Sequence, residues 1–246
     1  MEIDNKKAEL GKKILILLIC FYISIDLASD VLASRLVPLG HNHLMINASA
    51  FCYPVTYLIS DTITELFGFS YGRLTIWIEI IVDWVFVWLI IGLISLPLPE
   101  NSSIAVHFHA VLYPMSRVAI SEVPALIIGR FINIYFLAKS KILLNSRFFL
   151  IRSMASSCLG AVTRTIIVNY FIFSGVLGYS AIASIVFIRS LFDIFTIVFL
   201  SWIPFLVVYF VRNKLGIDEF NYKEKFNPFK RRFQCLSATG LSLSAQ

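Results

Sequence analysis

The sequence contains little that would support disulfide bonding or enzymatic chemistry. Its 246 residues include four cysteines, at positions 20, 52, 158 and 235. No two of them form a C-x-x-C pair, so the pattern excludes a disulfide framework. A Walker A loop, an H-E-x-x-H helix and a G-x-S-x-G turn are all missing, which leaves an ATPase, a zinc protease or a hydrolase without motif support. We therefore expect a protein that is not an enzyme and that has no resident cofactor.

The histidines offer no complete metal site either. They form two H-x-H pairs, His41 with His43 and His107 with His109, both in segments predicted to lie outside the membrane on one side. Such pairs bind Zn²⁺ or respond to acid pH in some proteins. Because no cysteine or carboxylate stands at ligand spacing from them, we expect no metal to be bound.

Apolar residues dominate the sequence. They make up 58% of the chain, the mean hydropathy is +0.81, and a bilayer-spanning helix needs roughly 20 such residues in a row. The pattern predicts an all-α, polytopic integral membrane protein, with residues 1–13 as an N-terminal segment, 14–211 as the membrane domain and 212–246 as a flexible basic tail. Six transmembrane helices are expected, at 14–37, 44–67, 74–96, 113–138, 150–173 and 181–211.

Basic residues indicate the orientation of these spans. Lysines at 6, 7, 12 and 13, Arg73, the basic loop 139–152 and the tail all fall on one side, whereas Arg35 alone falls on the other. The positive-inside rule then places both termini in the cytoplasm. The net charge of +6 is read as this orientation signal together with contact to anionic lipid. Nucleic-acid binding is not expected.

Several ionisable residues fall at membrane depth, where a charged side chain is costly and usually faces the interior of a helix bundle. Arg189 and Asp193, four residues apart with opposite charge, are expected to satisfy each other on one helix. Arg117 and Glu122 are expected to find partners on other helices. Three acidic pairs share the same i,i+4 spacing, which places both carboxylates on one helical face: Asp26 and Asp30, Asp61 and Glu65, and Glu79 and Asp83.

The pair Asp61 and Glu65 is the strongest site candidate, since no basic residue follows in sequence before Arg73. We expect both carboxylates to lack a partner within the protein, and two such carboxylates on one face favour a cationic or hydrogen-bond-donating ligand, or a proton site. The alternative is a polar seam that fixes helix packing. Pro54 interrupts the backbone hydrogen bonding of the same span, a feature typical of helices that line a transporter cavity. Aromatic rings that could stack on a flat ligand stand nearby, at Phe51, Tyr53, Tyr57 and Trp77.

The stretch "LISDTITELFGFSYGR" (58–73) resembles the signature of the queuosine-precursor transporter family, also called vitamin-uptake-transporter-like proteins. The matching pattern is Asp-x-x-x-Glu-x-x-Gly at Asp61, Glu65 and Gly68, followed by a small-residue turn and Arg73. Three further stretches are similar to later segments of that family: "YPMSRVAIS" (113–121), "GRFINIYFLAKSKILLNSRFFLIRSMASS" (129–157) and "FIRSLFDIFTIVFLSWIP" (187–204). The resemblance covers most of the chain and the same six-span layout.

The resemblance implies a secondary transporter in the bacterial inner membrane that imports 7-deazaguanine bases, such as preQ0, preQ1 or queuine, for tRNA modification. A carboxylate could accept hydrogen bonds from the guanine-like edge of such a base while an aromatic ring stacks on it. The expected substrate-binding residues are Asp61, Glu65, Phe51, Tyr53, Tyr57, Asp30, Trp77, Arg117 and Arg164.

The chain departs from the family pattern at four positions, where the resemblance would lead us to expect Asn, Gln, Asp and Asp: Asp30, Arg130, Asn133 and Arg164. An arginine in place of an acid changes the local charge by two units, and Asp30 or Glu122 could compensate it. These departures leave open which 7-deazaguanine base, or which other small heteroaromatic compound, is carried.

Three alternatives stay open at this point. The chain could be a membrane-embedded substrate-binding subunit of a larger transport complex, or a carrier of another heteroaromatic compound. It could also be a membrane enzyme that uses its paired carboxylates as metal ligands, although the denser acidic motif of such enzymes is missing. The coupling ion and any association into a homo-oligomer are not fixed by the sequence.

Overall fold

Helices account for most of the chain that the structure describes. The computed structural model describes residues 2–33, 35–39, 44–97, 107, 111–112, 115–175 and 177–216. Two short strands, β1 (Leu36–Leu39) and β2 (Leu44–Asn47), form a hairpin. The helices are α1 (Glu2–Leu32), α2 (Ser49–Phe67), α3 (Phe69–Ile94), α5 (Met115–Leu143), α6 (Phe149–Phe173), α7 (Tyr179–Leu200) and α8 (Trp202–Leu215). The predicted all-α class is confirmed.

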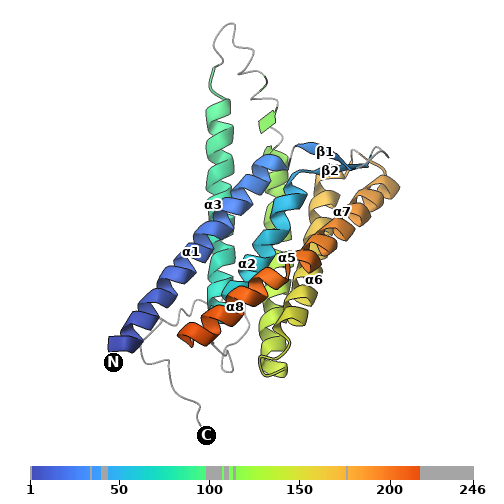
Figure 1. Ribbon diagram of the computed structural model, residues 1–246. Helices are drawn as coiled ribbons and strands as arrows, with labels where there is room; N and C mark the ends of the chain where they lie inside the picture. The colour runs from blue at the N-terminus through green and yellow to red at the C-terminus, as the bar shows by residue number, and fades with distance from the viewer. Residues whose placement is uncertain are drawn as a thin grey trace.

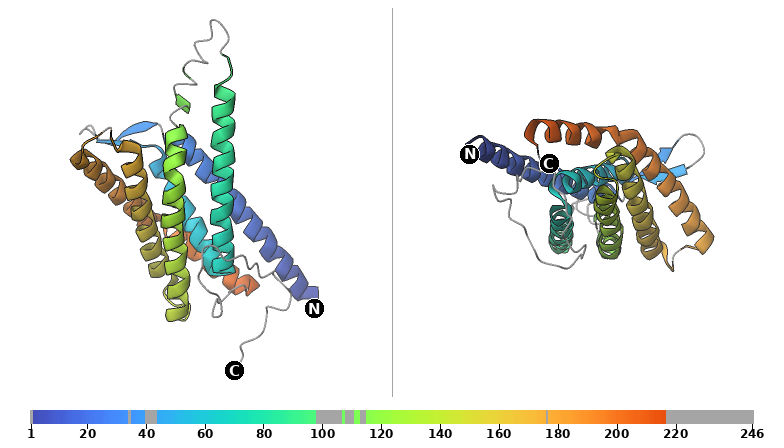
Figure 2. Two further views of the ribbon diagram at one scale, coloured as in Figure 1. Left: turned by 180° about the vertical axis from the view of Figure 1, so that it is seen from behind. Right: turned by 90° about the horizontal axis from the view of Figure 1, so that it is seen from below.

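Five segments of the described chain are long and apolar enough to cross a membrane. They lie in α1, α3, α5 and α6 and in the segment Tyr179–Lys214, which contains α7 and α8. α2 runs between them through the middle of the bundle (Figure 1; Figure 2). It carries many polar side chains and is not one of the five. The chain is therefore a multi-pass membrane protein, and the predicted six crossings agree approximately with these five segments and α2.

The surface of the bundle is apolar and its interior is polar, which is the arrangement expected in lipid. Large side chains such as Trp88, Phe195 and Phe199 are exposed on the outside. Asp61, Glu79 and other ionisable side chains are buried within.

The two ends of the bundle differ in character. α1 begins and α8 ends at one end, which also holds the turn between α5 and α6 (Figure 1). Lys12 belongs to the first part of α1, Lys139 to the last turns of α5, and Arg147 to the turn before α6, so we call this end the basic end. The opposite end carries the β1–β2 hairpin and the start of α7 (Figure 1), and we call it the hairpin end.

The hairpin corrects two predicted helix boundaries. The first predicted span reached residue 37 and the second began at 44, but residues 36–39 and 44–47 pair as antiparallel strands, with Val37 opposite Ile46. The Pro38-Leu39-Gly40 sequence favours a chain reversal over helix continuation. The Ala48 N–H donates to the Arg35 carbonyl at 2.8 Å, which extends the strand pairing by one residue on each side. The Asn47 Nδ2 donates to the Ala33 carbonyl at 2.5 Å, which ties the hairpin to the end of α1.

The helices at the basic end are longer than the predicted spans. α1 begins at Glu2 instead of residue 14, and Glu9 with Lys13 forms an i,i+4 salt bridge of 2.8 Å in the additional turns. α8 continues to Leu215, so Arg212 belongs to a helix and not to the tail predicted to begin there. Short polar helical turns of this kind carry no hydropathy signal and are missed by a search for apolar runs.

α2 is the central helix, because it packs against α1, α3, α5, α6, α7 and α8. It is continuous through Pro54, so the sequence-based expectation of a broken helix is not met. Gly68, with φ of 88°, separates α2 from α3.

Close packing between α5 and α6 depends on two glycines. A Cβ on Gly160 would lie 2.8 Å from the Gly129 carbonyl oxygen, and one on Gly129 would lie 2.9 Å from the Gly160 carbonyl oxygen. Small residues at such a crossing allow backbones to approach closely in membranes. This contact positions the polar side chains of α5 and α6 against α2.

Candidate functional site

One face of α2 presents polar and aromatic groups to its neighbours along its whole length. Tyr53, Tyr57, Asp61 and Glu65 follow each other at i,i+4 spacing, which aligns them on one side of the helix. All four are buried. They belong to separate levels of the bundle, from a cavity at the hairpin end to an ion-pair cluster at the basic end.

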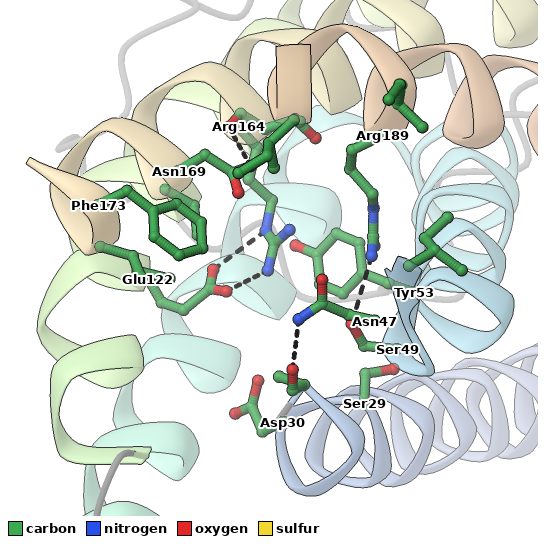
Figure 3. Close-up of a pocket in the computed structure, with 17 residues that line it drawn as sticks. Ser29, Asp30, Asn47, Ser49, Tyr53, Glu122, Arg164, Asn169, Phe173 and Arg189 are labelled. Carbon is green, nitrogen blue, oxygen red and sulfur yellow. Dashed lines mark hydrogen bonds and ion pairs between the residues drawn. The ribbon is translucent and has the colours of Figure 1, made fainter. Parts of the chain in front are cut away.

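A cavity of about 530 Å³ lies at the hairpin end between α1, α2, α5, α6, α7 and β2 (Figure 3). Ligand pockets for small molecules are typically of this size and combine apolar walls with a few polar groups. The apolar part of the lining includes Ile46, Val168, Ile172, Phe173 and Ile188. The polar part consists of Ser29, Asp30, Asn47, Ser49, Tyr53, Glu122, Arg164, Thr165, Asn169 and Arg189.

Arg164 is the central cation of the cavity. Its guanidinium forms a two-point ion pair with the Glu122 carboxylate, joining α6 to α5 (Figure 3). The guanidinium carbon also lies 3.6 Å from the centroid of the Tyr53 ring, a cation–π contact. Glu122 therefore compensates the charge at the position where the chain departs from the family pattern, and it finds its partner on another helix, as predicted.

The other polar groups of the cavity are partly available for a ligand. The Asn169 Nδ2 donates to the Thr165 carbonyl at 2.7 Å, and the amide oxygen accepts no hydrogen bond from the described residues. The Asp30 carboxylate stands at the α1 side of the cavity (Figure 3), and its side chain forms neither a hydrogen bond nor a salt bridge with any residue whose side chain the structure describes. These oxygens are acceptors that a ligand with N–H groups could use.

Arg189 is held at the α7 side of the cavity. Its Nε lies 3.0 Å and 3.2 Å from the two Asp193 oxygens, which confirms the predicted pairing within one helix. The Thr165 hydroxyl also donates to Asp193 at 3.1 Å.

Asp61 lies outside the cavity lining and is satisfied by uncharged donors. Its side chain accepts hydrogen bonds from Asn133 Nδ2 at 2.9 Å, Ser153 Oγ at 2.5 Å and Ser157 Oγ at 2.7 Å. The expectation that this carboxylate has no partner is therefore wrong. The partners come from α5 and α6, at least 72 residues further along the chain, and a sequence pattern within one span cannot reveal them.

Glu65 is also paired, in a cluster at the basic end. Its carboxylate lies 2.9 Å from the Arg152 Nη2 and 2.9 Å from the Arg212 Nη2, and its backbone carbonyl accepts from the Lys141 Nζ at 2.6 Å. The cluster ties α2 to α5, α6 and α8. The structure thus brings Asp30, Tyr53 and Arg164 together in the cavity and places Asp61 and Glu65 elsewhere.

The remaining predicted site residues are not part of the cavity lining. Phe51 is half-exposed and packs edge-on against Phe192, with 5.1 Å between ring centroids. Trp77 packs against Phe131 at 6.0 Å. Tyr57 lies one turn below Tyr53, with the Arg130 guanidinium 4.2 Å from its ring centroid. The side chain of Arg117 and the histidines at 41, 43 and 109 lie outside the described residues, and His107 is exposed.

Sequence reasoning missed Asn47 and Asn169 as cavity residues and did not assign Glu122 or Arg189 to the site. The available signal was the polarity of Asn169 in an otherwise apolar stretch, five residues after Arg164. Asn47 could not be found in this way, because its position depends on the hairpin.

Comparison with known families gives one match. The family described as "Putative vitamin uptake transporter" matches residues 47–209, which includes α2, α3, α5, α6, α7 and part of α8. Searches of curated proteins and of solved structures found no match.

Proposed function

The chain belongs to this family of vitamin uptake transporters, and on that premise we propose that it imports a 7-deazaguanine base, a precursor of queuosine, through the cavity at the hairpin end. The chain is a membrane transporter and not an enzyme. The finer assignment of the substrate rests on the chemistry of the cavity and on the resemblance of residues 58–73 to queuosine-precursor transporters.

The observation that carries the proposal is the combination of an aromatic ring, a guanidinium and a carboxylate around one cavity of about 530 Å³. A 7-deazaguanine base is flat and offers several N–H donors along one edge. Asp30 can accept two of these hydrogen bonds at once, which is a strong charge-assisted arrangement when the ligand is cationic. Tyr53 and Phe173 supply rings for stacking, and the Asn169 amide oxygen supplies a further acceptor.

We therefore assign the role of ligand-binding carboxylate to Asp30, and no longer to Asp61 or Glu65 as the sequence suggested. Asp61 and Glu65 already accept hydrogen bonds or ion pairs from side chains of the protein, whereas Asp30 lines the cavity. Arg164 and Glu122 stay paired and contribute a fixed dipole and one wall.

We further propose that the protein lies in a bacterial inner membrane with both termini in the cytoplasm. The basic end then faces the cytoplasm, in agreement with the positive-inside rule, and the cavity lies toward the outer side. The Glu65 cluster lies at the opposite end of α2. Such an arrangement suits an importer that receives its substrate from outside.

The test is the queuosine content of tRNA in cells that cannot make the precursor and that are fed one 7-deazaguanine base at a time. Native protein should restore queuosine with one base or more, and Asp30→Asn should fail while reaching the membrane in equal amount. Glu9→Gln is the matched control, because it neutralises an exposed carboxylate on the same helix. Full restoration by Asp30→Asn would remove Asp30 from the site, and restoration with no base would refute this choice of substrate.

Purified protein in liposomes separates the carrier from a subunit of a larger transport complex. A carrier takes up labelled base without any other protein, whereas a subunit binds the base and does not move it. Uptake of a different heteroaromatic compound in the same assay would keep the carrier function and change the substrate.

A further inference from the structure

Below the cavity, α1, α3 and α5 bring several buried charges together around Arg130. The Arg130 Nε and Nη2 lie 3.2 Å and 3.0 Å from the Glu79 Oε1, and the Tyr22 hydroxyl donates to Glu79 Oε2 at 2.5 Å. Arg130 Nη2 also lies 3.7 Å from Asp26 Oδ1, which is too long for a hydrogen bond. Asp83 stands one helical turn from Glu79 on α3, and its charge acts on Asp26. We call Asp26, Glu79, Asp83 and Arg130 the acidic cluster.

The charges of the acidic cluster do not balance. Three carboxylates share one guanidinium, and the four residues are at most 8% exposed. An uncompensated charge at this depth is expensive, and a protein avoids the cost by neutralising the group or by binding a counter-ion. Arg130 cannot supply more than one positive charge, so the cluster requires a further cation.

Three atoms of the acidic cluster are buried without a hydrogen-bond partner in the described part of the chain: Asp26 Oδ1, Asp83 Oδ1 and Arg130 Nη1. Buried polar atoms are nearly always satisfied in native proteins, and each exception calls for an explanation. A proton on a carboxylate would neutralise one charge and create a donor for a neighbouring acceptor. Among the described residues no group of three or more acidic, histidine or cysteine side chains is arranged to hold a metal ion. A proton needs only one carboxylate oxygen and no set of ligands, so it is the cation that we infer for these unpartnered oxygens.

The acidic cluster is connected to the cavity by two routes. On α1, Asp26 is followed one turn later by Asp30, which lines the cavity. On α2, the Tyr53 ring has the Arg164 guanidinium carbon 3.6 Å and the Arg130 guanidinium carbon 4.8 Å from its centroid. Tyr53 thus touches the cation of the cavity and the cation of the acidic cluster. A change of charge at Asp26 acts on Arg130 and, through it, on a ring of the cavity wall.

We propose that the acidic cluster is the proton-binding site that couples import to a proton gradient, an inference that rests on the proposed carrier function. A hydronium ion on the outer side gives its proton to a carboxylate oxygen of Asp30, which passes it to an oxygen of Asp26 or Asp83. At each transfer one O–H bond breaks as the next one forms, and on the cytoplasmic side the proton is given to water together with release of the base. Asp26 is the central acceptor, because it lies one turn before Asp30 on α1 and its charge interacts with those of Glu79 and Asp83 on α3. The titratable and charged groups that face it are Tyr22 and Asp30 on α1, Glu79 and Asp83 on α3, and Arg130 on α5. Arg130 in turn lies over the rings of Tyr53 and Tyr57 on α2, and Glu122 and Arg164 act on Asp30.

The test for coupling uses purified protein in liposomes with the membrane potential held at zero. Native protein should accumulate labelled base when the outside is acidic, by about tenfold per coupled proton for a gradient of one pH unit, because one pH unit and a tenfold concentration ratio are the same free energy. Asp26→Asn should keep base exchange across the membrane at equal pH and lose this accumulation. The proposal would be overturned if Asp26→Asn and Asp83→Asn both accumulated the base as strongly as native protein does. It would also be overturned if accumulation by native protein did not depend on the pH gradient.

A second measurement does not depend on the cargo. Infrared spectra of the native protein at neutral pH should contain the C=O stretching band of a protonated carboxylic acid, and this band should shift in heavy water. The band should be lost in the double variant that combines Asp26→Asn with Asp83→Asn. Glu9→Gln should leave the band unchanged. Absence of the band in native protein would refute the proton site. A band in a protein that moves no 7-deazaguanine base would instead refute the proposed substrate and leave the proton site standing.

Discussion

Glu65 and Arg152 form a two-point salt bridge between α2 and α6, with 2.9 Å from Arg152 Nη2 to Glu65 Oε1 and 3.1 Å from Nη1 to Oε2. Both side chains are at most 2% exposed. The same carboxylate receives Arg212 of α8, so one acid joins three helices at the basic end.

Glu65→Gln should therefore lower the stability of the bundle and leave the affinity of the folded protein for its substrate largely unchanged. The change leaves two arginines without their counter-charge, and breaking a buried pair costs about 3–5 kcal/mol. The melting temperature in detergent should fall well below that of native protein and of Glu9→Gln. A variant with native stability that no longer binds base would return Glu65 to the substrate site.

Asp61 should behave as a structural acceptor. Asp61→Ala leaves Asn133, Ser153 and Ser157 without their acceptor, and each unsatisfied buried group costs about 1–3 kcal/mol. Asp61→Asn keeps one oxygen, and a serine hydroxyl can turn to accept from the new amide, so its loss of stability should be smaller. Denaturation in detergent measures the stability of native protein, Asp61→Asn and Asp61→Ala, which should decrease in that order. Native stability with abolished uptake in Asp61→Asn would support the ligand-binding role predicted from the sequence.

Arg164 and Glu122 should show strong coupling in a double-mutant cycle. Arg164→Gln and Glu122→Gln each leave a charge without its partner, while the double variant leaves none. The double variant should thus be more stable than the sum of the two single losses predicts, by about 0.5–3 kcal/mol. Arg189→Gln with Glu122→Gln provides the comparison, because Arg189 pairs with Asp193. Additive losses for Arg164 and Glu122 would show that the pair is not maintained.

Tyr53 can be tested with two substitutions that separate its ring from its hydroxyl. The hydroxyl is buried without a hydrogen-bond partner among the described residues, so Tyr53→Phe should match native stability and retain the contacts of the ring with both arginines. Tyr53→Leu removes the ring and should weaken base binding, measured as the dissociation constant by titration in detergent. Equal affinity for Leu and Phe would exclude stacking at this position.

The α5–α6 crossing should not tolerate a side chain at Gly160. Its Cβ would lie 2.8 Å from the Gly129 carbonyl and 2.9 Å from the Asn133 Cβ, and such overpacking costs about 1–3 kcal/mol. Gly160→Ala should lower the melting temperature. Gly92→Ala, where a Cβ meets nothing within 4 Å, is the matched control and should leave it unchanged or raise it. Equal melting temperatures would mean that the helices cross elsewhere.

The class of fold and the set of buried polar residues can be predicted from the sequence alone, because apolar runs and the cost of a charge in lipid are local properties. Asp30, Tyr53 and Arg164 were predicted as site residues and do line the cavity. The roles of Asp61 and Glu65 were not predictable, because their partners Asn133, Ser153 and Arg152 are remote in sequence. The hairpin was missed since its strands are four residues long and continue the apolar character of the helices beside them.

The central place of α2 has a consequence for how the protein is made. A helix with this many polar groups gains little by entering lipid alone, and only Gly68 separates it from the apolar α3. The two helices should therefore insert together as one hairpin. The ribosome produces the partners of Asp61 and Glu65 only later. Asp61 therefore remains unsatisfied in the nascent chain until α5 and α6 have been synthesised, and the cluster around Glu65 is complete only when Arg212 of α8 has followed Arg152 of α6.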